Sequence, residues 1–176
     1  MNVVLVRASE SDQPTLANLL HLYVHDFSEF LGTTPSKQGW FSYPNLPHYI
    51  QEESRAAFLI QAADNLVGFA LTSRGSLVSG DPEVSDVSEF FVVRGVRRHG
   101  VGRAAAHELL STVPGVWEVR VNESNGPAQY FWRRVVEQYT GGSFSLEPWM
   151  RDDGSKWRVF RFKSSSSVGS GRLPAA

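Results

Sequence analysis

Residues 87–103 read VSEFFVVRGVRRHGVGR and join an apolar run to a glycine-rich turn. The β-branched and aromatic residues of Val87–Val93 are typical of a buried strand. Gly100 and Gly102 follow it, and Ala104–Ser111 has the pattern of a helix. Glycines let the backbone come close to a ligand, and the free amides that begin a helix attract anions. Four arginines lie in the same stretch: Arg94, Arg97, Arg98 and Arg103. The stretch therefore predicts a site for a polyanion such as a pyrophosphate.

The elements on either side of this stretch predict one α+β domain. An amphipathic helix begins near Ser11 or Asp12, a second begins at Asn125–Pro127, and a loop with several aromatic residues occupies 31–49. Strands are expected at Val3–Arg7, Ala57–Ala62, Leu66–Thr72, Val87–Val93, Val116–Val121, Phe144–Met150 and Lys156–Phe162. This order predicts a central mixed sheet flanked by helices over residues 1–163. The small, polar residues of 164–176 are typical of a disordered tail or an expression remnant.

Composition narrows the possible functions. The 176 residues fit one domain, and a net charge of -1 argues against a dedicated nucleic-acid binder. The absence of cysteine excludes a disulfide scaffold, a thiolate zinc site and a cysteine nucleophile. No apolar run approaches the ~20 residues of a membrane span, and Arg7 and Glu10 interrupt any signal-peptide core. We therefore expect a cytoplasmic protein that binds neither membrane nor nucleic acid.

The glycine turn is compatible with more than one polyanion. Gly100-x-Gly102-x-x-Ala105 also satisfies the dinucleotide fingerprint, with Glu123 about 20 residues further on. That fold needs a run of parallel strand–helix–strand units, whereas the turn here follows a hairpin and precedes only one more helix. A nucleotide-dependent oxidoreductase is therefore the weaker interpretation.

The turn and a second motif resemble a known family. Val92-x-x-x-x-Arg97-Arg98-x-Gly100-Val101-Gly102-Arg103 resembles motif A of the GNAT acyltransferase superfamily, in particular a bacterial group of predicted acetyltransferases. Asn125-x-x-Ala128-x-x-Phe131-Trp132 resembles its motif B. The order of elements from Val3 to Phe162 also matches. The resemblance implies a GNAT-like domain with a mostly antiparallel sheet and a V-shaped splay between two central strands.

The resemblance also implies acetyl-CoA as the acyl donor, with no metal. The activity implied is N-acetylation of a primary amine on a small molecule or peptide, by direct attack in a ternary complex. It leaves open whether the protein is a homodimer. The implied CoA-binding residues are Phe91, Val92, Val93, Arg97, Arg98, His99, Gly100, Val101, Gly102, Arg103, Asn125, Ala128 and Phe131.

One departure from the family pattern concerns the general acid. The family often places a tyrosine one residue after the Phe or Leu of motif B, where this chain has Trp132. Tyr130 lies about 200° away around the helix and is a poor substitute. The identity of the acid stays open. A non-catalytic module that binds acyl-CoA is the alternative that this loss permits.

Candidate residues for the acceptor side are acidic and aromatic. Glu89 is the one carboxylate within the strand Val87–Val93, and it shares a face with Phe91 in a regular strand. We expect Glu89 to act as the base, with Asp86 in reserve. Asp26, Glu29, Trp40 and Tyr43 are predicted to bind a cationic amine. His21 and His25 have the spacing of a metal pair but no recognisable third ligand, so we expect no metal site.

Overall fold

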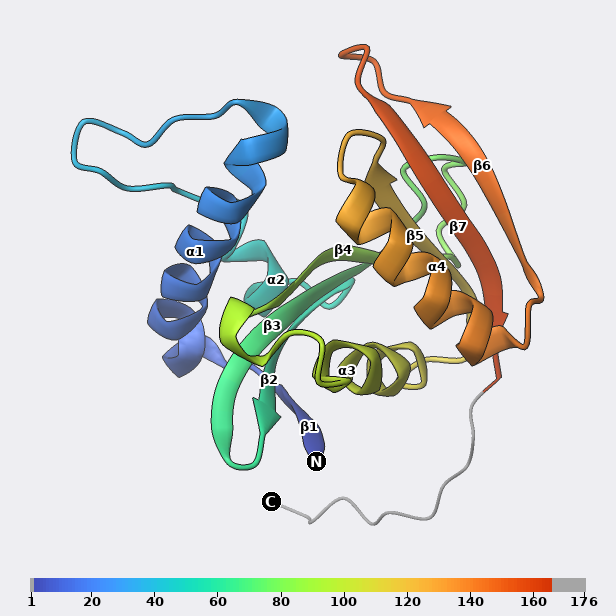
Figure 1. The fold of residues 1–176 in the computed structure, drawn as a ribbon, viewed down its shortest axis with the longest axis horizontal. Coiled ribbons are helices and arrows are strands. Elements are labelled where there is room, and N and C mark those ends of the chain that lie inside the picture. The colour runs from blue at the N-terminus through green and yellow to red at the C-terminus, as the bar shows by residue number, and fades with distance from the viewer. Residues whose placement is uncertain (1, 166–176) are drawn as a thin grey trace.

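The computed structural model describes residues 2–165 of the chain. Figure 1 shows its elements. In chain order they are β1 Val3–Arg7, η1 Glu10–Asp12, α1 Gln13–Leu31, α2 His48–Gln51, β2 Arg55–Ala62, β3 Asn65–Arg74, β4 Ser85–Val92, η2 Arg94–Val96, α3 Val101–Leu110, β5 Gly115–Asn122, α4 Gly126–Thr140, β6 Phe144–Met150 and β7 Lys156–Ser164. The predicted order is confirmed, except that α2 forms one helical turn at the end of the expected loop.

The seven strands form a single sheet in the order β1-β2-β3-β4-β5-β7-β6. Every neighbouring pair is antiparallel except β4 and β5, which run parallel. That parallel pairing joins only Ser85, Asp86 and Val87 to β5, and beyond Val87 the two strands separate. The predicted V-shaped splay is confirmed. One parallel pair does not make the parallel sheet of a dinucleotide-binding fold.

A β-bulge lies in β4 where the splay begins. Leu71 of β3 pairs with Glu89, and the next residue, Thr72, pairs with Val87, so Ser88 is an extra residue in β4. A bulge bends its strand and shifts the alternation of side chains by one residue. Asp86 and Glu89 therefore point to the same face of the sheet, although they are three residues apart.

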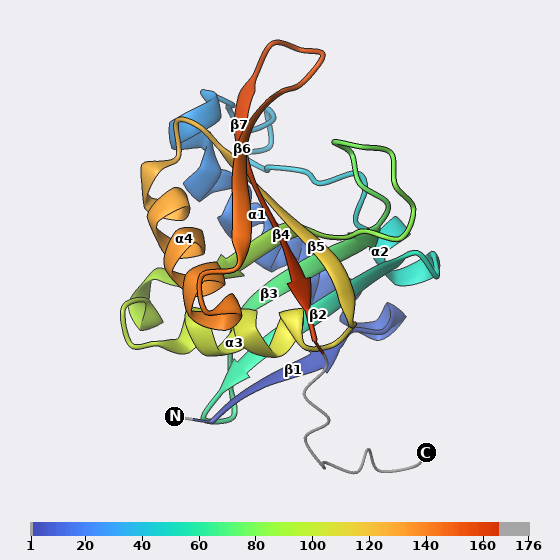
Figure 2. The same ribbon diagram turned by 90° about the vertical axis from the view of Figure 1, so that its right-hand side faces the viewer.

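Helices cover both faces of the sheet (Figures 1 and 2). On one face α1 and α2 pack against β2 and β3 through a cluster that includes Leu16, Leu20 and Phe69. On the other face α3 and α4 pack against β5 and β7 through Leu109 and Trp117, among others. The side chains of Glu89 and Phe91 lie on the α1 face, because Phe91 belongs to the α1 cluster.

The two long helices begin and end as their sequences predict. Asp12 precedes α1 and a proline lies in its first turn. In α4 the Asn125 side chain caps the helix by accepting a hydrogen bond from the Ala128 amide at 3.0 Å. Gly141 ends the helix in the left-handed conformation, with φ of 62°.

The last strand extends further than the sequence predicted. Ser164 is 5% exposed, and its hydroxyl donates to the Leu110 carbonyl at 2.7 Å and contacts the Tyr139 hydroxyl. The ordered domain therefore passes the predicted boundary at residue 163, and 166–176 of the predicted tail lie outside the described residues. Within residues 2–165, no helix has the length and apolar character needed to cross a bilayer.

Candidate active site

The turn before α3 leads directly into the uncapped first turn of that helix. Arg98 has φ of +67° and Gly100 has φ of +81°, both in the left-handed region. Gly100 precedes the helix without a side-chain cap, and its carbonyl accepts the first helical bond, from the Ala104 amide. The amides of Val101, Gly102 and Arg103 thus belong to the open first turn, where helices bind anions. This geometry suits a phosphate or pyrophosphate group.

Helices α3 and α4 approach each other closely at Gly102. A Cβ atom at this position would lie 3.2 Å from the Phe131 ring and 3.7 Å from the Val92 side chain. Val101, by contrast, is buried in the core, and only its backbone faces the turn. Gly102 therefore keeps α3 close to Phe131 and to the end of β4.

The arginines of the turn are partly engaged within the protein. Arg97 donates from Nε to the Val92 carbonyl at 2.7 Å and from its terminal nitrogen to Asp26 at 2.8 Å. Arg94 forms a bidentate pair with the same carboxylate, which lies on α1. These guanidinium groups hold the pKa of Asp26 below its ordinary value, although burial acts in the opposite direction. Asp26 was predicted to bind the acceptor, and in the structure its carboxylate pairs with Arg94 and Arg97, which links α1 to the segment before the glycine turn.

The other side chains of the turn are exposed. Arg98 and His99 lie at the surface, and Arg103 contacts the Gln138 side chain of α4 at 3.4 Å. Their positions around the first turn of α3 leave them available to an anion.

The backbone of β4 faces two directions beyond the bulge. The Val93 amide donates to the Val67 carbonyl at 2.9 Å, so it pairs with β3. By the alternation of an antiparallel ladder, Phe91 also faces β3, whereas Phe90 and Val92 direct their backbone groups toward the splay. The prediction that Phe91 and Val93 offer main-chain hydrogen bonds to pantetheine is therefore wrong. Phe90 can do so, and so can the amide of Val92, whose carbonyl already accepts from Arg97.

The start of α4 forms the opposite side of the splay. Phe131 stacks on Phe90 with ring centroids 5.8 Å apart, and Trp132 meets Phe90 edge-on at 5.3 Å. Ala128 packs against the same cluster. Asn125, which was predicted to line the pantetheine, is 8% exposed, and its side-chain oxygen is used to cap α4. The apolar wall thus consists of Phe131, Trp132 and Phe90.

Glu89 lies at the splay between two phenols. The Tyr23 hydroxyl of α1 donates to its Oε2 at 2.5 Å, and the Tyr43 hydroxyl of the following loop donates to its Oε1 at 2.9 Å. Burial raises the pKa of Glu89 above its ordinary value, while these two hydrogen bonds and the charge of Arg120 oppose that increase. Because the extra residue, Ser88, precedes Glu89, the regular alternation holds from Glu89 to Phe91 and the two side chains share a face, as predicted.

Asp86 lies nearby, but its negative charge is paired with the positive charge of Arg120. It is fully buried, and Arg120 of β5 holds it with bonds of 2.9 Å from Nε and 2.8 Å from a terminal nitrogen. The same guanidinium lies 5.9 Å from the centre of the Trp149 ring. A carboxylate fixed in this way is a weak candidate for a base, so the geometry favours Glu89 over Asp86.

Comparison with known proteins decides the family. The model of the acetyltransferase (GNAT) family matches residues 16–136, more than half of the chain.

The chain belongs to the GNAT acetyltransferase family.

Solved structures share this fold at low sequence identity. An acetyltransferase from Thermus thermophilus is 18% identical with a TM-score of 0.67, covering 93% of this chain and 98% of that one. Spermidine N-acetyltransferase from Vibrio cholerae, in complex with CoA and spermine, is 12% identical with a TM-score of 0.65, covering 95% and 98%. The ribosomal-protein-S18-alanine N-acetyltransferase from Escherichia coli is 14% identical with a TM-score of 0.60, covering 99% and 100%. A comparison of the sequence with curated proteins finds no match.

The loop after α1 brings only part of its predicted residues to the site of this GNAT domain. Tyr43 reaches Glu89, but Trp40 stacks on His21 with ring centroids 4.0 Å apart and is 42% exposed. The Phe41 amide donates to Nδ1 of His21 at 3.0 Å. Glu29 is exposed near the end of α1. His21 therefore anchors the loop that carries Tyr43.

Sequence reasoning missed three residues of this GNAT site. The first is Tyr23, which matches the apolar stripe of α1 and so indicates core packing. The second is Arg120, which lies in a strand without a motif. The third is Phe90, which no local pattern separates from Phe91. The bulge brings Asp86 and Glu89 to one face, and the pairing of β4 with β5 brings Arg120 to Asp86. The sequence encodes neither in a recognisable motif.

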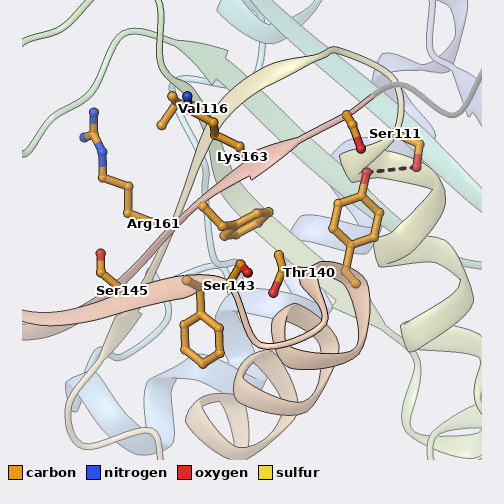
Figure 3. Close-up of a pocket in the computed structure, with 11 residues that line it drawn as sticks. Ser111, Val116, Thr140, Ser143, Ser145, Arg161 and Lys163 are labelled. Carbon is orange, nitrogen blue, oxygen red and sulfur yellow. Dashed lines mark hydrogen bonds between the residues drawn. The ribbon is translucent and has the colours of Figure 1, made fainter.

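A separate groove lies away from the motifs of the GNAT family. It has a volume of about 740 Å³ and lies where α3 and α4 end against β7 (Figure 3). Ser111, Tyr139, Arg161 and Lys163 are among its lining residues. None of the predicted site residues lines this groove, so we locate the candidate active site at the splay and the glycine turn.

Proposed function

We propose that this protein transfers an acetyl group from acetyl-CoA to a primary amine by direct attack in a ternary complex. One observation is the main support for this proposal. Glu89, a partly buried carboxylate with a raised pKa, lies where β4 parts from β5 and carries two phenolic hydrogen bonds. A protein that only bound acyl-CoA would have no need of such a group beside the splay.

The donor is bound from both sides of the splay in this proposal. The amides of Val101–Arg103 receive the pyrophosphate. The Phe90 carbonyl and the Val92 amide pair with pantetheine as an added strand would, since the Val92 carbonyl already accepts from Arg97. Phe131 supplies the apolar wall opposite them. The Phe90 amide, next to Glu89, stabilises the oxyanion that forms on attack.

The acceptor is a cation before it reacts. An amine with a pKa of ~10 is almost entirely protonated near pH 7, so a base must remove its proton. Because Arg120 neutralises Asp86, Glu89 keeps an uncompensated negative charge at this point. Its raised pKa brings it closer to neutral pH, where a general base works best. Glu89 therefore attracts the ammonium group and accepts its proton.

The family relatives support an amine acceptor without naming it. One is described as a spermidine acetyltransferase and another as an acetyltransferase of an alanine of ribosomal protein S18. We propose a small-molecule amine or a peptide amine as the acceptor here, within a cytoplasmic setting.

The test is release of CoA thiol from acetyl-CoA with a panel of amines and amino-terminal peptides, paired with calorimetric titration of CoA. Turnover with at least one amine, above the rate without amine, is the expected result. Tight CoA binding with no turnover across the panel would instead support the non-catalytic module. Loss of both would contradict the assignment of the glycine turn.

A further inference from the structure

We infer that Tyr23 of α1 is the general acid that protonates the departing thiolate of CoA, taking the role for which motif B of this chain has no tyrosine. The inference rests on the proposed acetyl transfer. The position that carries the acid in many relatives is Trp132, which is 6% exposed and packed on Phe90. An indole N–H is not an acid of useful strength.

The chain offers few other phenols and no thiol. It has five tyrosines and no cysteine, and all five tyrosines lie within residues 2–165. Two of them belong to α4, and their hydroxyls do not face the splay. The Tyr139 hydroxyl contacts Ser111 and Ser164 at the end of the helix that is remote from the splay, and Tyr130 is 64% exposed and contacts Arg134. A phenolic acid must therefore come from the α1 side of the sheet.

Tyr23 is the best placed of the remaining three. Its ring packs edge-on against Phe69 at 5.8 Å and Phe91 at 6.1 Å, so the helix holds it against β3 and β4 beside the splay. Tyr43 is carried by the loop rather than by a helix. Tyr49 is 8% exposed, and its ring lies beside Tyr43 and under Arg55. Tyr23 alone combines a rigid position, contact with β4 and contact with Glu89.

The hydrogen bond between Tyr23 and Glu89 links the two proton transfers. At rest the phenol donates to the ionised carboxylate at 2.5 Å. Once Glu89 has taken a proton from the attacking nitrogen, the carboxyl O–H can donate to the phenol oxygen. The direction of the hydrogen bond then reverses, and the phenolic proton becomes free to turn toward the sulfur.

The protons and bonds balance in this sequence. The acceptor arrives as an ammonium ion, and Glu89 removes one proton from it and passes that proton to water. Its nitrogen forms the C–N bond and gives a second proton to Glu89. The C–S bond breaks, the thiolate takes the phenolic proton of Tyr23, and Glu89 returns its proton to the phenolate. The products are the amide and CoA thiol, with both residues restored.

The surroundings keep the phenol protonated until it is needed. Burial, followed by the charge of Glu89, raises the pKa of Tyr23 well above its ordinary value. The same two causes raise the pKa of Tyr43. Both groups therefore remain donors throughout the neutral range, and position rather than acidity separates them.

The first test compares Tyr23→Phe with Tyr43→Phe, since each removes one phenol from the same carboxylate and retains the ring. We expect Tyr23→Phe to lower kcat by about 100-fold, within the range of general acid catalysis, with both KM values nearly unchanged. Tyr43→Phe should cause a much smaller loss. Equal losses in the two variants, or an unchanged kcat in Tyr23→Phe, would overturn the inference.

The second test replaces Tyr23 with 3,5-difluorotyrosine, whose phenol is more acidic. Activity should return, and kcat should now fall at alkaline pH as this phenol ionises, whereas the parent stays level there. Restored activity without that alkaline fall would assign Tyr23 a structural role and refute the inference. The parent enzyme separates the two hypotheses: a parent without turnover refutes the proposed function itself, whereas an active parent with an active Tyr23→Phe variant refutes only the role of Tyr23.

Discussion

Replacing Glu89 with Gln tests the base directly. The amide has the shape of the carboxylate, so its oxygen can still accept from one phenol and its NH2 group can face the other. Without a base, the rate follows the fraction of free amine in solution. For an amine of pKa ~10 that fraction is about one in a thousand near pH 7 and about one in ten near pH 9. We expect kcat/KM to fall at least tenfold and by up to about 1000-fold near pH 7, with the deficit shrinking toward high pH.

The assay is thiol release at saturating acetyl-CoA across this pH range, with the amine varied. The matched control is Glu147→Gln, which makes the same change at an exposed residue of β6 and should leave the profile unaltered. Affinity for acetyl-CoA should hardly change in Glu89→Gln. If the pH profile of the variant overlays that of the parent, Glu89 is not the base and the reasoning fails.

Three further predictions concern the turn, the ion pair and stability. Gly102→Asp should abolish CoA binding in calorimetry, because it adds a negative charge at the phosphate site and its Cβ would lie 3.2 Å from the Phe131 ring, which must shift slightly. Gly95→Asp, which has open space around its Cβ, should bind with nearly parental affinity. Asp26→Asn should raise the KM for acetyl-CoA by a factor of about two to five and spare the KM for the amine, because partly exposed ion pairs contribute ~0–1 kcal/mol; the reverse pattern would restore Asp26 to the acceptor site. Since the folded chain raises the pKa of Glu89 above its ordinary 4.5, the folded state holds that proton more tightly, and this stability is lost as pH rises through the folded pKa. Glu89→Gln should therefore melt at a higher temperature than the parent near pH ~8, with the difference disappearing near pH ~4 in calorimetric scans.

The fold could be predicted from sequence because its signals are local. Alternating apolar runs, the capping residue Asn125 and the glycine turn at 100–102 each act within a few residues, and they place nearly every element. The one-turn helix α2 lacks a periodic pattern long enough to be recognised. The extension of β7 depends on hydrogen bonds from Ser164 to two distant helices, which no local pattern records.

The site could be predicted only in part, for a similar reason. Glu89 was identifiable because a carboxylate in an apolar strand is unusual. Tyr23 was not, since an amphipathic helix places aromatic residues on its inner face whether or not their hydroxyls have a role. The pairing of Asp26 with Arg94 could not be predicted either, because the two residues are 68 positions apart in the sequence. The alternation of backbone groups along β4 follows from its pairing register with β3, so sequence alone could not separate Phe90 from Phe91.

The opening in the sheet depends on the number of residues in β4 and not on which residue occupies position 88. Pairing between β4 and β5 stops at Val87, immediately before the extra residue bends β4. Replacement of Ser88 by another residue keeps the extra position, and with it the opening. Deletion of this one residue would make β4 a regular strand, which could continue its pairing with β5 beyond Val87. That pairing would close the space that the acyl donor needs, although every proposed catalytic side chain would still be present. The opening is thus robust to point substitution in evolution and vulnerable to a single in-frame deletion.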